Sequence, residues 1–178
     1  MSVIRITQAA TILSHWIEAV PNDRLAHLVR DATRAFSRAL QVRLNAHNVS
    51  FGHWTFLRVL WEHDGLTQRQ LSEEVGVMEP TTYAAVRSME ALGYVLREQR
   101  HGNRKNIHVR LTSRGRALKR KLVPLAVDVN RIGVAGIDPA DVVNTRRVLI
   151  AIITNLAADE LTAAELPRRS PAGRRKRE

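Results

Sequence analysis

The sequence contains no cysteine in its 178 residues. This absence excludes disulfide bonds, cysteine-ligated metal sites, thiol nucleophiles and thiol-based redox sensing, and it fits a reducing compartment. Long apolar runs are missing as well, because the longest, VLIAII at 148–153, is far too short to span a bilayer. The first segment, MSVIRITQAATILSHW, has no apolar core behind a basic start. We therefore expect a cytoplasmic protein without a secretory signal.

Positive charge is concentrated in two places. Residues Arg97–Arg116 carry a net charge of +6 and Pro167–Glu178 carry +5, which accounts for the whole net charge of +11. A charge run is often only a solvated face, but charge focused in this way attracts polyanions and speeds their encounter. The distribution favours a nucleic-acid partner.

Helical spacing of apolar residues predicts four longer helices. They cover about 23–46, 51–63, 113–132 and 138–158. The first carries an apolar stripe from Leu25 to Leu40 with arginines on another side, and the last begins at Asp138-Pro139. Apolar stripes near both ends of the chain need a surface to bury them, which favours a homodimer.

Between these helices, two short helices are predicted with almost no linker. In LTQRQLSEEVG (66–76), Thr67 and Gln70 have the spacing of a capping box, and the final glycine ends the helix. In VMEPTTYAAVRSMEALGYV (77–95), Pro80 suits the first turn and Gly93 ends the helix. Its apolar side holds Thr82, Val86, Met89 and Leu92, and its outer side holds Thr81, Tyr83, Ala84, Arg87 and Ser88. Two short helices joined by a tight turn indicate a helix-turn-helix.

The next segment predicts a β-hairpin. YVLREQR (94–100) and NIHVRLT (106–112) alternate apolar and polar residues and flank HGNRK, a basic turn with glycine and asparagine. A hairpin directly after a helix-turn-helix gives the winged form of that motif. Thr112 is predicted to cap the helix that follows.

Taken together, LTQRQLSEEVG, PTTYAAVRSMEALGYV and VRLTSRG resemble the MarR family of bacterial transcription regulators, over roughly 23–158. The resemblance implies a mainly α fold with a small β-hairpin wing, in which a winged helix-turn-helix is flanked by terminal dimerisation helices. The expected parts are an N-terminal extension (1–22) that could form a helix, dimerisation helices (23–47 and 117–160), a DNA-binding lobe (48–116) and a basic, disordered tail (161–178).

The resemblance also implies a function. The protein is expected to be a homodimeric repressor that binds a palindromic operator and is released by a small-molecule effector, without an enzymatic activity or a cofactor. Once bound to DNA, it would be associated with the bacterial nucleoid. The candidate DNA contacts on the second short helix are Thr81, Thr82, Tyr83, Arg87 and Ser88.

The wing supplies the remaining DNA candidates, which are Arg97, Arg100, Asn103, Arg104 and Lys105. The family's usual aspartate and arginine in the wing are Asn103 and Lys105 here, so the acidic anchor is missing. Because arginine favours narrow, A·T-rich minor grooves, Arg104 is the expected inserted residue. Lys105, Arg100 and Arg97 are expected to contact phosphates.

The effector site is expected near the start of the helix at 51–63. Arg30, Arg34, His53 and Trp54 form a basic and aromatic set that suits an aromatic carboxylate or its coenzyme A thioester. The alternative interpretation is that Trp54 belongs to the core and that His53 is a surface residue.

Three other classes of function have weaker support in the sequence. Metal sensing has candidate donors around 47–64, but their spacing is poor. His101 and His108 have no carboxylate or thiol partner nearby, so no metal site is predicted. Catalysis is disfavoured, because no nucleophile elbow, phosphate-binding glycine loop or carboxylate pair is present. The main alternative is a sequence-independent, architectural DNA-binding protein, to whose affinity the basic tail would add.

Overall fold

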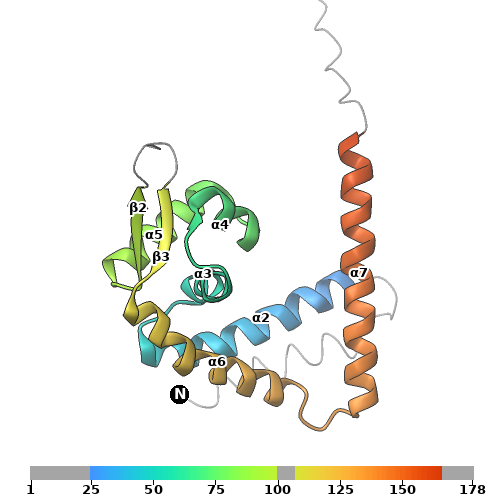
Figure 1. Cartoon of the computed structure of the whole chain (residues 1–178). Helices are drawn as coiled ribbons and strands as arrows, with labels where there is room; N and C mark the ends of the chain where they lie inside the picture. Colours follow the sequence, from blue (N-terminus) through green and yellow to red (C-terminus); the bar gives the residue numbers. More distant parts are fainter. Residues whose placement is uncertain (1–24, 100–106, 166–178) are drawn as a thin grey trace, which may run out of the picture. The chain divides into compact units, whose positions relative to one another are not determined.

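The computed structural model describes residues 25–99 and 107–165 (Figure 1). The chain divides into two units, and the second begins at Val134. The first unit contains α2 (Leu25–Leu44), a 3-10 turn (Asn45–His47), α3 (Phe51–Glu62), β1 (Leu66–Thr67), α4 (Gln68–Val75), α5 (Glu79–Ala91), β2 (Val95–Gln99), β3 (Ile107–Leu111) and α6 (Ser113–Gly133). The second unit consists of α7 (Pro139–Glu165). This mainly helical architecture with one small antiparallel sheet confirms the predicted fold class.

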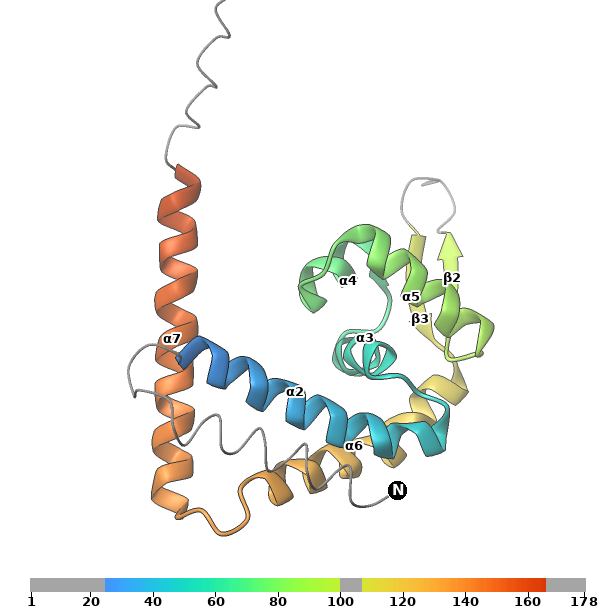
Figure 2. The ribbon, with the colours of Figure 1, turned by 180° about the vertical axis from the view of Figure 1, so that it is seen from behind.

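Two long helices, α2 and α6, pack side by side along one side of the first unit (Figure 2). They form because apolar residues recur once per turn, so that each helix has one buried face. The face of α2 contributes Leu40 and Leu44, and that of α6 contributes Leu118 and Leu122.

The helix-turn-helix forms from local signals. The Thr67 hydroxyl accepts the backbone N–H of Gln70, and the Gln70 side chain accepts the backbone N–H of Thr67, which completes the predicted capping box of α4. Gly76 ends α4 with a φ of 72°, a left-handed conformation that glycine adopts without strain. The buried Ser72 hydroxyl donates to the Val77 carbonyl and fixes the turn into α5.

The wing is part of a three-stranded antiparallel sheet in the order β1-β3-β2. Strands β2 and β3 form the predicted hairpin, in which Val95 is paired with Leu111 and Gln99 with Ile107. The short strand β1 was not predicted, and it pairs Leu66 with Val109 on the other edge of β3. β3 is therefore the central strand, and the sheet is tied to the start of the helix-turn-helix.

A single core joins the long helices, the helix-turn-helix and the sheet. Its fully buried side chains come from every layer of the first unit and include Leu44, Leu57, Leu60, Leu71, Val86, Met89, Tyr94, Val109 and Leu122. The Tyr94 hydroxyl, at the base of β2, donates to the Asn48 carbonyl beyond the end of α2. Because this core contacts the inner side of α5, it fixes which of the α5 side chains face outward.

The second unit differs from the first in having no buried residue along its helix. The helix α7 extends to Glu165, further than the predicted end at about Ala158. Large apolar side chains are exposed along it, among them Val143, Ile150, Ile153, Leu156 and Leu161. Within the described residues, no helix combines the length and the hydropathy needed to cross a membrane.

Candidate nucleic-acid interface

Helix α5 presents a stripe of exposed side chains on the side away from the core. Thr81, Tyr83, Arg87 and Ser88 are all exposed, as is the short Ala84 between them. The helix begins with Pro80 in its first turn, where the missing N–H breaks no intrahelical hydrogen bond. These positions match the outer face that the helical periodicity predicts.

Thr82 is the exception among the predicted contacts on α5. Its side chain is fully buried together with Val86 and Met89, so it cannot reach a DNA groove. Within the described residues, its hydroxyl has no hydrogen-bond partner. The inclusion of Thr82 among the DNA contacts was wrong, because the threonine shares the apolar stripe that attaches α5 to the core.

Arg97 is held by an ion pair between the wing and α5. Its guanidinium lies 2.7 Å from the Glu90 carboxylate and donates a second hydrogen bond of 2.8 Å through Nε. The bond lowers the pKa of Glu90 below its usual value and raises the pKa of Arg97, with a smaller effect from the Tyr83 hydroxyl. The expected phosphate contact from Arg97 is therefore not its main interaction in this structure.

The exposed aromatic ring of α5 also lies next to a cation. The guanidinium carbon of Arg87 lies 5.9 Å from the ring centre of Tyr83, within the range of a cation–π contact. Arg97 and Arg87 thus both interact with Tyr83. Because Arg97 of β2 is paired with Glu90, Arg87 is the residue that supplies positive charge to the outer side of α5.

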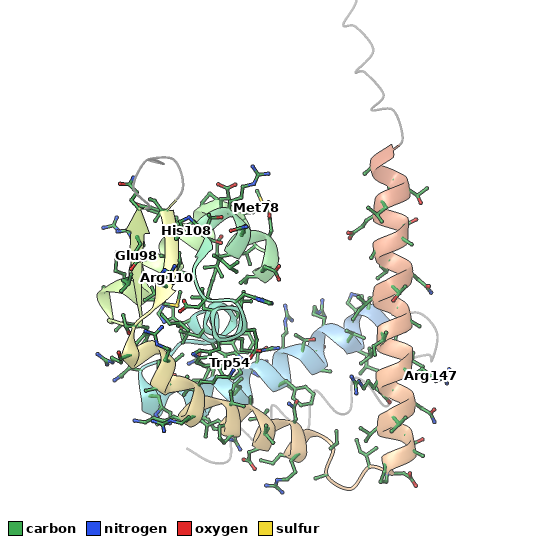
Figure 3. All side chains as sticks on the ribbon, viewed as in Figure 1. Trp54, Met78, Glu98, His108, Arg110 and Arg147 are labelled. Carbon is green, nitrogen blue, oxygen red and sulfur yellow. The ribbon has the colours of Figure 1, made fainter. Side chains whose placement is uncertain are left out.

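The base of the wing is anchored by Asp64, just after α3. One carboxylate oxygen accepts the backbone N–H of Leu111 at 2.8 Å, and the other lies 3.1 Å from the Arg116 guanidinium. On the strands, Arg110 pairs with Glu98 at 2.8 Å. Figure 3 shows Arg110 and Glu98 close together on the hairpin. The wing is therefore oriented by charged contacts at its base as well as by its backbone ladder.

Four of the predicted wing residues lie outside the described residues. These are Arg100, Asn103, Arg104 and Lys105. The described strands, β2 and β3, lead to the segment that carries them. Their contacts with DNA stay predictions.

A cleft of about 1020 Å³ opens between α2, α3, α6 and the end of α4. Its apolar lining includes Phe36, Trp54 and Trp61, and its cationic residues are Arg58 and Lys119. Trp54 and Trp61 stack edge to face, with ring centres 5.6 Å apart. Lys119 is paired with Glu62 at 2.8 Å, whereas no ion pair of Arg58 is found within the described residues.

Of the four predicted effector contacts, only Trp54 lines this cleft. Trp54 is also buried in the core, which agrees with the alternative interpretation of that residue. Arg30 and Arg34 both pair with Asp31 on the exposed side of α2. His53 is half-buried, its Nδ1 has no partner within the described residues, and burial lowers its pKa. The structure thus does not bring Arg30, Arg34 and His53 into the cleft with Trp54.

Comparison with known proteins decides the family. The MarR family model matches residues 49–107, which run from just before α3 to the first residue of β3. The HTH-type transcriptional regulator TtmR of Methylorubrum extorquens is 30% identical over 152 residues, which is 82% of this chain and 73% of TtmR. The chain belongs to the MarR family. It is a DNA-binding transcription regulator of that family, and the family consists of regulators rather than enzymes.

Solved MarR-family structures share the fold. A regulator from Listeria monocytogenes, complexed with 26mer DNA, has a TM-score of 0.69 and 20% identity, covering 84% of this chain and 99% of its own. BpsR of Bordetella bronchiseptica, whose DNA binding is regulated by 6-hydroxynicotinic acid, has a TM-score of 0.67 and 19% identity, covering 73% of this chain and 98% of its own. At these identities the likeness shows the winged-helix fold alone.

Sequence reasoning missed the partners of several charged residues in this MarR-family chain. Asp64 lies at the end of the range 47–64 that offers candidate metal donors, but its two oxygens contact the wing base and Arg116. His108 Nδ1 lies 2.9 Å from the Gly65 carbonyl. No group of three histidine or carboxylate side chains suited to a metal ion is found within residues 25–99 and 107–165. The Asp64 and His108 contacts join residues more than forty positions apart, so no local pattern could have indicated them.

Proposed function

We propose that this MarR-family protein places α5 in the major groove of an operator and the tip of its wing in the adjacent minor groove. The observation that carries the proposal is the division of α5 into two sides. Val86 and Met89 fix one side to the core, while the exposed polar stripe lies on the other. A recognition helix needs both a rigid base and exposed side chains that reach base edges.

The four polar residues of the exposed stripe each have a role suited to their chemistry. Arg87 can donate two hydrogen bonds to guanine O6 and N7, and the hydroxyls of Thr81 and Ser88 can bond to either kind of base pair. Tyr83 suits a phosphate or a thymine methyl. In the wing, Arg104 is proposed as the minor-groove residue, and Arg100 and Lys105 as phosphate contacts.

We further propose that the protein acts as a homodimer on a palindromic site. The exposed apolar side chains of α7 support this, because a helix with none of its residues buried needs a surface against which to pack. The start of α2 has the same character, with Leu25 and Leu28 exposed. A twofold dimer presents two α5 helices to two equivalent half-sites, which is why its operator would be palindromic.

The cleft is proposed as the effector site. It is lined by aromatic rings and has at its wall the cation Arg58, for which the described part of the chain offers no ion pair. This lining suits a planar aromatic carboxylate or the larger coenzyme A thioester. The regulation of BpsR by 6-hydroxynicotinic acid, an aromatic acid, supports this class. Trp54 remains in the proposal, whereas Arg30, Arg34 and His53 are replaced by Arg58 and Lys119.

A ligand in this cleft would contact the long helices and the helix-turn-helix together. Phe36 belongs to α2, Trp54 to α3, Val75 to α4 and Lys119 to α6. An effector that binds one arrangement of these helices better than another shifts the population toward it. We propose that the bound arrangement spaces the two α5 helices wrongly for the operator, so that the effector releases a repressor.

The test is selection of binding sites from a random DNA library, followed by gel-shift titration of the enriched duplex. Near physiological salt, we expect a palindrome bound at least about 1000-fold more tightly than random DNA. Aromatic acids and their coenzyme A thioesters are then added to the complex, and at least one is expected to release it. Arg58→Gln should abolish that release without weakening DNA binding.

Two outcomes would contradict this proposal. If no sequence is enriched and binding disappears as salt rises, the protein is a sequence-independent, architectural DNA-binding protein instead. If a palindrome is enriched but no acid or thioester releases it, the effector part of the proposal is wrong while the DNA-binding part stands.

A further inference from the structure

Met78 lies at the N-terminal end of α5, where a methionine side chain does not help the helix to form. It is the N-cap residue, and its side chain makes no capping hydrogen bond. Serine, threonine, aspartate or asparagine at this position would accept an N–H from the first turn, which methionine cannot do. Its backbone carbonyl does accept the N–H groups of Thr81 and Thr82, so the helix begins here in spite of the missing cap.

The Met78 side chain also contributes little to the core. It is 77% exposed, whereas Met89 on the same helix is fully buried. A single exposed apolar residue is ordinary in itself. Here, however, exposure is combined with a helix cap that a small polar residue would fill better, so neither the packing of the first unit nor the start of α5 explains a methionine.

The position of Met78 is that of a residue facing DNA. Residues at the N-terminal end of a recognition helix point toward base edges in the major groove. Figure 3 shows Met78 at the junction of α4 and α5, on the same side of the first unit as the outer ends of β2 and β3. It also precedes Thr81 and Tyr83, the first residues of the exposed stripe.

The surroundings of Met78 favour contact of its side chain with a DNA base rather than with a phosphate. Glu79 is exposed in the first turn of α5 and carries a negative charge that repels phosphate groups. An unbranched thioether is flexible and polarizable, and it gains from contact with apolar groups. In the major groove, the apolar group is the C5 methyl of thymine.

We propose that Met78 is a specificity-determining residue that contacts a thymine methyl in each operator half-site. This inference rests on the proposed function, since it requires α5 to lie in the major groove. It adds an apolar contact to the hydrogen bonds of Arg87, Thr81 and Ser88. A methionine at this position provides the contact with DNA but leaves α5 without a side-chain cap, so binding and stability favour different residues here.

The experiment compares Met78→Ser with Met78→Leu, using the operator obtained by binding-site selection. Serine supplies a side-chain cap, so the thermal midpoint should rise by about 2–4 °C. Serine also lacks the apolar side chain, so operator affinity should fall about 5- to 10-fold. Leucine keeps an apolar side chain and adds no cap. Its thermal midpoint should be unchanged, and its affinity should stay within about 2-fold of the wild type.

A second set of binding measurements changes the DNA instead of the protein. Each thymine of the half-site is replaced in turn by uracil, which removes only the C5 methyl. At one position this replacement should weaken wild-type binding about 3- to 5-fold, the value of one buried methyl. The same replacement should have no effect on binding by Met78→Ser.

Each result decides between the two proposals. If the wild type enriches a site and Met78→Ser binds it as tightly, or responds to every uracil as the wild type does, the role of Met78 is wrong and the proposed function stands. If the wild type enriches no site at all, the proposed function fails and the inference fails with it.

Discussion

Gly115 lies in the first turn of α6, where the helix passes against the backbone of the α5–β2 connection. A Cβ at this position would lie 2.0 Å from the Tyr94 carbonyl oxygen, which is far inside the contact distance. Its own carbonyl accepts the indole N–H of Trp61 at 3.0 Å. The glycine is thus required by close packing between α6, the sheet and α3.

We expect Gly115→Ala to destabilise the protein by about 2 kcal/mol or more, because the backbone must move to make room. This outweighs the gain in helix propensity, which is at most about 1 kcal/mol. Urea unfolding at neutral pH measures the difference. Gly52→Ala is the control, since its nearest neighbour would be the Ser50 hydroxyl at 3.7 Å. That variant should be as stable as the wild type or more so, and equal losses in both would contradict the packing argument.

At the scale of elements, the Glu90–Arg97 ion pair joins α5 to β2. Because the pair lowers the pKa of Glu90 in the folded chain, the ionised carboxylate stabilises the fold above the pKa of the unfolded chain. The contribution disappears as the pH falls through the lower, folded-state pKa. Both side chains are about one third exposed, so solvent screening keeps the contribution below about 1 kcal/mol.

We therefore expect Glu90→Gln to be slightly less stable than the wild type at pH 7 and equally stable in strong acid. Urea unfolding of both proteins in steps from neutral to acidic pH measures this difference. In an Arg97→Gln background, the same substitution should lose its pH dependence. A difference that stays constant through the acidic range would show that the ion pair contributes nothing.

The elements that could be predicted from the sequence are those with local signals. Helix α4 was found because Thr67 and Gln70 cap it within one turn, and the hairpin because its two strands alternate around a glycine turn. The two-residue strand β1 was missed, since only its pairing with β3 makes it a strand.

The candidate site could likewise be predicted only where local sequence signals exist. Periodicity identified the exposed stripe of α5, but charge alone did not reveal that Arg97 is paired with Glu90 on a different element. Thr82 was named as a DNA contact although its spacing put it with the buried residues. Arg58 was not singled out, because the cleft it lines is assembled from four helices.

At the scale of the whole molecule, the proposed dimer depends on the apolar side chains of α7. We expect Ile153→Glu to convert the dimer into a species of about 20 kDa, because Ile153 is 67% exposed and would place a charge in the interface. Multi-angle light scattering measures the mass, and operator affinity should fall with it. Asn155→Glu is the matched control, since two residues correspond to slightly more than half a helical turn.

The light-scattering masses decide whether the dimer forms and where its interface lies. If the wild type is already monomeric at micromolar concentration, the dimer is wrong and the exposed face of α7 needs another explanation. If Asn155→Glu dissociates the dimer as fully as Ile153→Glu does, the interface surrounds the helix instead of lying along one side.

The order of the strands has a consequence for how copies of the chain can associate. The two edges of the described sheet are β1, which is only two residues long, and β2, which carries Arg97, Glu98 and Gln99 at its outer end. A short strand and a charged strand are both poor templates for a strand from another molecule. Neither edge of the described sheet therefore favours pairing with the wing of another copy, which lowers the tendency of copies to aggregate through these strands.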